Sequence, residues 1–99
     1  MALIYLVRIE GNTTTSSWND VVKAFELEKN AIELLAELSA NEKRDIENGD
    51  HDGFRDGHYS IAFDDNVPDE YSKAEVQTCI YNQNTNDWIT IYVEEVELV

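Results

Sequence analysis

The sequence is poor in cysteine, proline, glycine and basic residues. Of its 99 residues, one is cysteine, one is proline, four are glycine and seven are lysine or arginine. The single cysteine, Cys79, excludes an intramolecular disulfide, which is typical of a chain that folds in a reducing compartment such as the cytoplasm. Neither histidine lies near Cys79 in the sequence. We therefore expect it to be a small buried residue of a strand rather than a catalytic thiolate.

Long apolar runs and leader segments are also missing. No stretch approaches the ~20 apolar residues that span a bilayer, and no basic segment leads into an apolar run with a small-residue cleavage site. We expect neither a membrane span nor a signal peptide. Hydrophobic residues make up 42% of the chain and aromatic residues 10%, which is too much for a disordered acidic tail. The length fits one folded domain over residues 1–99.

Acidic residues are abundant by contrast. Twenty-one aspartates and glutamates face seven lysines and arginines, which gives a formal net charge of −14. Residues 1–25 are neutral on balance, so residues 26–99 carry the whole excess. A chain this negative repels nucleic acid and anionic membranes. Its self-repulsion has to be offset by salt, a bound cation or a basic partner.

Apolar periodicity predicts one long helix, from about residue 27 to 47. Polar residues, among them Glu33 and Glu37, occupy the opposite face, and Asn48-Gly49 is a plausible stop signal. The residues of the predicted apolar face recur at helical spacing; they are Leu27, Ala31, Leu34, Leu35, Leu38 and Ile46.

Strand patterns surround this helix. Residues 3–9, 59–63, 76–82 and 88–98 are predicted strands, and 84–87 supplies the turn of a hairpin. The segment 18–25 fits either a short helix capped by Ser17 or a strand, and the strand is favoured. The predicted fold is α+β with the element order β-β-α-β-β-β, a mostly antiparallel sheet of four or five strands with the helix on one face. The near-continuous apolar character of the first strand favours a central position in the sheet.

Three segments resemble the corresponding parts of small ββα domains found among uncharacterised bacterial and phage proteins. They are Lys23-Ala24-Phe25, residues 29–35 and residues 53–61. The resemblance covers about the first two thirds of the chain and rests on generic motifs. It implies the fold and no activity.

The loop that follows the predicted helix matches part of a calcium-binding pattern. Oxygen-bearing residues alternate around Gly53, as in a loop of EF-hand type. The last position of that pattern requires a bidentate glutamate, and here it is Tyr59. An ordinary polar loop is therefore the favoured interpretation, and a calcium-binding or structural module is the alternative. The candidate loop residues are Asn48, Asp50, Asp52, Phe54 and Asp56.

Other motifs of catalytic or cofactor chemistry are missing. The sequence has no glycine-rich phosphate loop, no Gly-x-Ser-x-Gly and no His-Glu-x-x-His. The spacing of His51 and His58 fits no zinc pattern. Acids are so frequent that carboxylate pairs arise by chance, and a working pair needs a pocket that separates their pKa values. We expect a protein that is not an enzyme and has no metal or other cofactor.

The acidic surface remains as the candidate functional feature. Carboxylates on a helix or strand repeat at roughly 5–7 Å, close to the spacing of phosphates along nucleic acid. We therefore expect a non-catalytic protein that inhibits or regulates a nucleic-acid-binding partner by mimicking nucleic acid, by analogy with phage anti-CRISPR or anti-restriction proteins. A solvated or halophilic surface is the plain alternative. The candidate partner-binding residues are Glu33, Glu37, Asp45, Glu47, Asp50, Asp52, Asp56, Asp64, Asp65, Asp69, Glu70 and Tyr71.

Two further expectations concern aromatic residues and self-association. Tyr71 lies beside Asp69 and Glu70 in a predicted loop, so we expect its ring to be exposed and to contact the partner. The last strand, 88–99, could form a homodimer if it lies at an edge of the sheet.

Overall fold

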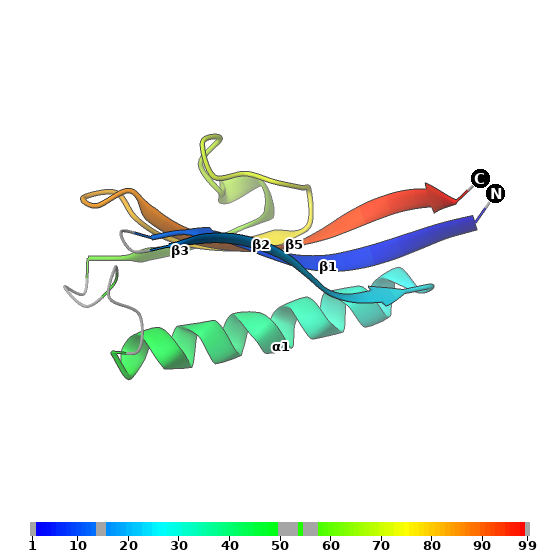
Figure 1. The fold of residues 1–99 in the computed structure, drawn as a ribbon, viewed down its shortest axis with the longest axis horizontal. Helices are drawn as coiled ribbons and strands as arrows, with labels where there is room; N and C mark the ends of the chain where they lie inside the picture. The colour runs from blue at the N-terminus through cyan, green and yellow to red at the C-terminus, as the bar shows by residue number, and fades with distance from the viewer. Residues whose placement is uncertain (1, 14–15, 50–53, 55–57, 99) are drawn as a thin grey trace.

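The computed structural model describes residues 2–13, 16–49, 54 and 58–98, and within these ranges it has one helix and five strands. The chain order is β1 (Ala2–Asn12), β2 (Ser17–Phe25), α1 (Glu28–Glu47), β3 (Ser60–Phe63), a short 3-10 helix η2 (Asp64–Asn66), β4 (Gln77–Asn82) and β5 (Asp87–Leu98). The strands form one antiparallel sheet in the order β2-β1-β5-β4-β3, with α1 along one face (Figure 1). The predicted α+β class and element order are confirmed, and the ambiguous segment 18–25 is a strand.

The two long strands β1 and β5 form the middle of the sheet. They pair along their whole length, from Ala2 opposite Leu98 to Asn12 opposite Trp88. The central position of β1 is therefore confirmed. The last strand does not lie at an edge, so the condition set for its pairing with a second copy is not met: β5 lies between β1 and β4, and the outer strands are β2 and β3. The first seven residues of β5, 87–93, are all at least partly buried, as a central strand requires.

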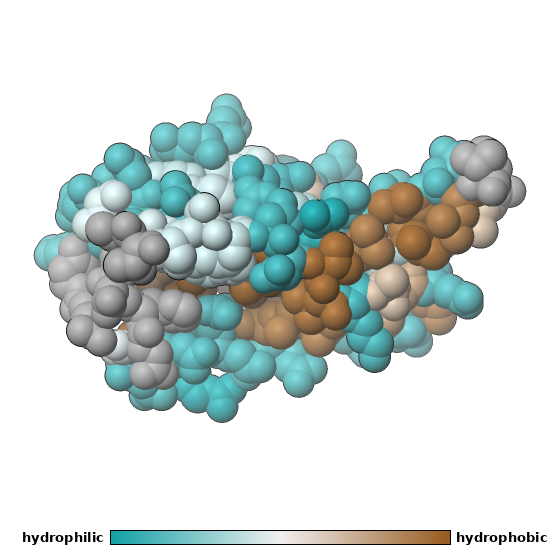
Figure 2. All heavy atoms as spheres, viewed as in Figure 1, coloured by the Kyte–Doolittle hydropathy of each residue, from teal (hydrophilic) through white to brown (hydrophobic). Residues whose placement is uncertain are grey.

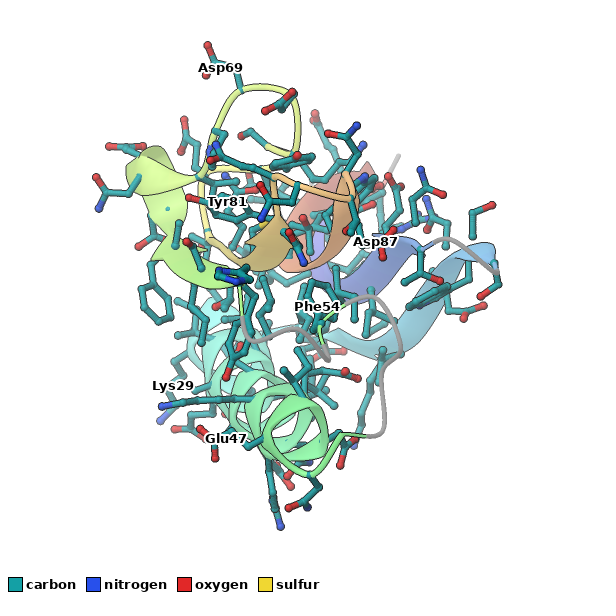
Figure 3. The ribbon with its side chains drawn as sticks, turned by 90° about the vertical axis from the view of Figure 1, so that its left-hand side faces the viewer. Lys29, Glu47, Phe54, Asp69, Tyr81 and Asp87 are labelled. Atoms are coloured by element: carbon teal, nitrogen blue, oxygen red, sulfur yellow. The ribbon has the colours of Figure 1, made fainter. Side chains whose placement is uncertain are left out.

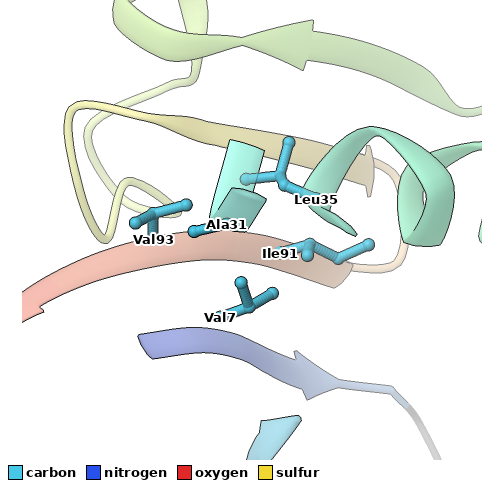
Figure 4. Close-up of a cluster of buried hydrophobic side chains, with 5 residues drawn as sticks. All are labelled: Val7, Ala31, Leu35, Ile91 and Val93. Atoms are coloured by element: carbon cyan, nitrogen blue, oxygen red, sulfur yellow. The ribbon is translucent and has the colours of Figure 1, made fainter. Parts of the chain in front are cut away.

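Helix α1 packs its apolar face onto the middle of the sheet. Ala31 and Leu35 meet Val7 of β1 and Ile91 and Val93 of β5 in a buried cluster (Figure 4). Leu34 and Leu38 pack partly buried against the same cluster, and Ile46 is buried near the far end of α1. The apolar face is thus largely as predicted.

The two ends of α1 differ from one another. Leu27 is the N-cap residue, and its side chain is 55% exposed. Its predicted place on the buried face is therefore wrong, because it precedes the first helical turn. At the other end the predicted stop is confirmed: the N–H of Gly49 donates to the carbonyl of Ile46 at 3.0 Å, and Gly49 has a φ of 81°, a left-handed conformation that favours glycine.

The opposite face of the sheet is covered by the connection between β3 and β4, residues 64–76 (Figure 1). Val67 and Tyr71 of this connection pack against Ala62 and Cys79 in a second buried cluster. The centroid of the Tyr71 ring lies 5.3 Å from that of the Tyr81 ring. The backbone carbonyl of Tyr71 accepts a hydrogen bond from the Thr90 hydroxyl at 3.1 Å. Cys79 is fully buried in β4, as expected.

The exposure predicted for Tyr71 is wrong. Its side chain is only 4% exposed, and its ring also lies 5.9 Å from that of Trp88. The acidic neighbours that suggested a solvent-facing residue are exposed, whereas the tyrosine points inward onto the sheet. Tyr71 is an anchor of the connection and not a contact residue on its surface.

Beyond these layers the sheet extends as a narrow end. The molecule measures 46 × 24 × 23 Å, and the end that carries both termini projects past α1 (Figure 1). Hydrophobic residues gather on the surface towards this end (Figure 2); Leu3 is 41% exposed and Leu98 45%. In the described part of the chain, no helix combines the length and apolar character needed to cross a membrane.

Candidate acidic interface

A groove rich in carboxylates lies along the segment that leads into β4. It consists of two adjoining hollows that share Lys73, Ala74 and Glu75. We call their combined surface the acidic groove. The first hollow, of about 330 Å³, is lined also by Tyr5 and by three glutamates from α1 and β5; these are Glu28, Glu94 and Glu95. The second, of about 440 Å³, receives three aspartates from η2 and the turn after it; these are Asp64, Asp65 and Asp69.

One buried amide side chain holds the walls of the second hollow together. Gln77 is 2% exposed, and its Oε1 accepts hydrogen bonds from the backbone N–H groups of Lys73 at 2.8 Å and Ala74 at 3.4 Å. Its Nε2 donates to the carbonyl of Asp64 at 3.1 Å and to the hydroxyl of Ser72 at 2.9 Å. The Gln77 backbone N–H donates in turn to a carboxylate oxygen of Asp64 at 3.1 Å. The groove is therefore built on a hydrogen-bonded frame.

The basic residue that lines the groove directs its charge elsewhere. The ammonium of Lys73 lies 2.7 Å from a carboxylate oxygen of Glu10 and 4.9 Å from the centre of the Trp88 ring. Arg8 lies 3.5 Å from Glu94, outside the lining of the groove. The carboxylates that line the groove thus outnumber the cations close to them, and the surface keeps a strong negative charge.

The titration of Tyr5 reflects this environment. Partial burial raises the pKa of its phenol, and the nearby carboxylates of Glu95 and Glu28 raise it further because they disfavour a second negative charge. Burial raises the pKa of the Cys79 thiol to about 11. Such a thiol stays protonated at neutral pH and is a poor nucleophile.

The predicted acidic residues that the structure describes fall into two sets on opposite sides of the sheet. Glu33, Glu37 and Glu47 are exposed on α1, where Asp45 is partly buried. Asp69 lies on the connection above the sheet while Glu47 lies on the helix below it (Figure 3). The structure brings together the aspartates of residues 64–69, with Glu70 exposed beside them, and does not join them to the helix carboxylates.

Four groove carboxylates were not among the predicted site residues. They are Glu28, Glu75, Glu94 and Glu95, from three separate segments. Glu94 and Glu95 interrupt the apolar run of β5, which is a signal the sequence does contain. No comparable sequence signal predicts that residues 73–75 lie alongside β5, because their position depends on where the connection crosses the sheet.

The candidate calcium loop is described only in part. Asp50, Asp52 and Asp56 lie outside the described residues, as does His51 of the candidate zinc pair. Asn48 is the C-cap of α1. Phe54 is 1% exposed, and its ring meets that of Tyr59 edge to face at 6.2 Å. Across residues 2–13, 16–49, 54 and 58–98 there is no group of three histidine, cysteine or acidic side chains arranged to hold a metal.

Comparison of the chain with protein-family models, with curated proteins and with solved structures gave no match. A functional proposal therefore rests on the geometry and charge of the groove.

Proposed function

We propose that this protein is a non-catalytic binding protein whose acidic groove receives a basic segment of a partner protein. The observation that supports the proposal is the gathering of carboxylates from η2, the β3–β4 connection, α1 and β5 around two hollows that adjoin along residues 73–75. Carboxylates arranged in this way attract lysine and arginine side chains and speed the encounter with a positively charged surface.

The groove is suited to recognition because its frame is ordered before binding. Gln77 and Asp64 hold the backbone of both walls, so little conformational entropy is lost when a partner docks. The chain's remaining negative charge adds long-range attraction for any basic surface. The ordered frame favours a binding role over a merely solvated surface.

The more specific form of the proposal is mimicry of nucleic acid. The partner would be a nucleic-acid-binding protein of the cytoplasm whose phosphate-binding lysines and arginines meet the carboxylates instead. A phage inhibitor of a restriction or CRISPR effector is the kind of protein in which this arrangement is useful. Mimicry makes a distinct prediction: the complex weakens as salt rises and is displaced by competing DNA or RNA. Salt ions screen the contacts between carboxylates and basic side chains, and nucleic acid competes for the same basic side chains.

Two variants that lose the same number of negative charges distinguish binding at the acidic groove from binding through the overall negative charge. The groove variant carries Asp65→Asn, Asp69→Asn and Glu75→Gln. The control variant carries Asp20→Asn, Glu26→Gln and Glu37→Gln, which are exposed on β2, between β2 and α1, and on α1. None of these six carboxylates belongs to the ion pairs of Arg8 and Lys73 or to the Gln77 frame.

The experiment begins with capture of partners on the immobilised protein from nuclease-treated lysate of its source cells, followed by titration of the purified partner by calorimetry. Each exposed ionic contact contributes about 0.5 kcal/mol, so the groove variant is expected to bind about tenfold more weakly. The control variant is expected to bind like the wild type. Equal weakening in both variants would show that only net charge matters, and full binding by the groove variant would refute the proposed site.

A further inference from the structure

An apolar groove of about 540 Å³ separates α1 from the outer strand β3. Its walls include Ala36, Ala40 and the stem of Lys43 on the helix, with Ile61 and Phe63 on the sheet. Phe63 is 55% exposed, and Ile32 on the neighbouring turn of α1 is 39% exposed. Exposed apolar surface beside a helix face is a common feature of interaction sites. None of these residues lines the acidic groove.

A stripe of six exposed residues runs along the same side of α1. Successive members are separated by four, three, four, three and four positions, which is the spacing that keeps side chains on one face of a helix. In chain order the stripe is lysine, glutamate, alanine, alanine, lysine, glutamate; its members are Lys29, Glu33, Ala36, Ala40, Lys43 and Glu47. Figure 3 shows its two ends, Lys29 and Glu47, on the same side of the helix.

The stripe is complementary to itself when it is reversed. In an antiparallel pair of helices, Lys29 faces the partner's Glu47 and Glu33 faces the partner's Lys43, while Ala36 faces the partner's Ala40. In a parallel pair, each of these charges would face its own like charge. The four charged members sum to zero, so this surface escapes the repulsion expected between two chains of net charge −14.

We propose that the protein forms a homodimer in which α1 packs antiparallel against α1 of a second copy across this stripe. The facing alanines allow the helix axes to approach to about 8 Å, and the contact extends over roughly 27 Å of helix. Four ion pairs flank the alanine pairs, and the partner helix covers the apolar groove with its exposed Phe63 and Ile32. The interface is isologous, as expected of a two-fold dimer.

Charge variants test this pairing and leave the apolar side chains of the groove, Ile61 and Phe63 among them, unchanged. The positive variant, Glu33→Lys with Glu47→Lys, has four lysines in the stripe. The negative variant, Lys29→Glu with Lys43→Glu, has four glutamates. Each variant faces only like charges when it meets its own copy, and each meets opposite charges in a mixture. Both variants keep a negative net charge, so general attraction does not explain association between them.

Mass is measured by sedimentation equilibrium at 10–100 µM and moderate salt. The wild type is expected at twice the 11.4 kDa of one chain, with self-association of each variant weakened at least 100-fold and a one-to-one heterodimer restored on mixing. A matched control, Glu26→Lys with Glu37→Lys, changes the charge equally off the stripe and is expected to remain dimeric. A monomeric wild type at 100 µM, or variants that dimerise alone as well as together, would overturn the proposal.

A second measurement serves if the charge variants do not fold. One chain carries Ala36→Cys and a second chain carries Ala40→Cys. In a mixed antiparallel pair these two thiols face each other closely enough for mild oxidation to form a covalent heterodimer, whereas a parallel pair places each thiol opposite its own copy. The native Cys79 is fully buried and does not compete. Preferential recovery of the mixed disulfide at micromolar concentration supports the antiparallel pairing. Chains that stay monomeric, or that form disulfides only with their own copy, contradict it. Neither result depends on the proposed acidic-groove partner.

Discussion

Replacement of Tyr71 by alanine separates two interpretations of this residue. If Tyr71 were an exposed contact residue, as its acidic neighbours suggest, the change would weaken partner binding and leave stability almost untouched. In the structure its ring is buried between the connection 64–76 and the sheet, against Tyr81 and Trp88. The buried position predicts a large loss of stability instead.

The size of that loss follows from the environment of the ring. Truncation of a buried large aromatic side chain to alanine costs about 3–5 kcal/mol, from lost transfer energy and the cavity left behind. Tyr71 is 4% exposed and makes two aromatic contacts, so its truncation belongs in this range. An exposed tyrosine replaced by alanine would cost less than about 0.5 kcal/mol.

Urea denaturation followed by circular dichroism measures the difference. With an m-value of about 1.5 kcal/mol per molar urea, a loss of 3 kcal/mol lowers the midpoint by about 2 M. Tyr71→Phe is the matched control, because it keeps the ring contacts and is expected to lose less than about 1 kcal/mol. A Tyr71→Ala protein whose midpoint falls by less than 0.5 M would refute the burial of this side chain.

Two further predictions concern the frame of the groove and the buried thiol. Gln77→Leu removes hydrogen bonds to both walls of the second hollow and is expected to cost about 2–4 kcal/mol of unfolding free energy; thermal unfolding measures it, and a melting temperature within 2 °C of the wild type would contradict the role of this amide. The pKa of Cys79 is raised from 9 to about 11, so the unfolded chain releases this proton at a lower pH than the folded chain does. Stability from this group is fully present below pH 9 and is lost as the pH rises through 11. The urea midpoint of the wild type should therefore fall further between pH 8 and pH 10.5 than the midpoint of Cys79→Ala. Equal falls in the two proteins would contradict the raised pKa.

Local pattern alone predicted the regular elements. The apolar face of α1 recurs at helical spacing, and the strands alternate or run apolar, so neighbouring residues carry the information. The stop at Asn48-Gly49 was likewise local, because only the glycine's conformational freedom is required there. Leu27 shows the limit of this reasoning: it matches the apolar spacing and yet lies at the cap, outside the packed turns.

Positions that depend on distant partners were open or wrong at the sequence level. The segment 18–25 has both helical and strand character, and pairing with β1 makes it a strand. The sequence left open whether the last strand lies at an edge, and hydrogen bonds to β1 on one side and β4 on the other make it central. The turn at 84–87 predicted the hairpin of β4 and β5, but no local signal indicated that β1 pairs with the other side of β5.

The sequence by itself determined the acidity of the chain, its apolar periodicities and the α+β class, because composition and short-range spacing are properties of neighbouring residues. Only the tertiary structure decided how the acids are distributed. It places Asp69 and Glu47 on opposite sides of the sheet and brings Glu28, Glu75 and Glu94 together from distant parts of the chain. The physical reason is that Tyr71 and Val67 pack the connection 64–76 onto the apolar surface of the sheet. This packing fixes the positions of the carboxylates on the connection.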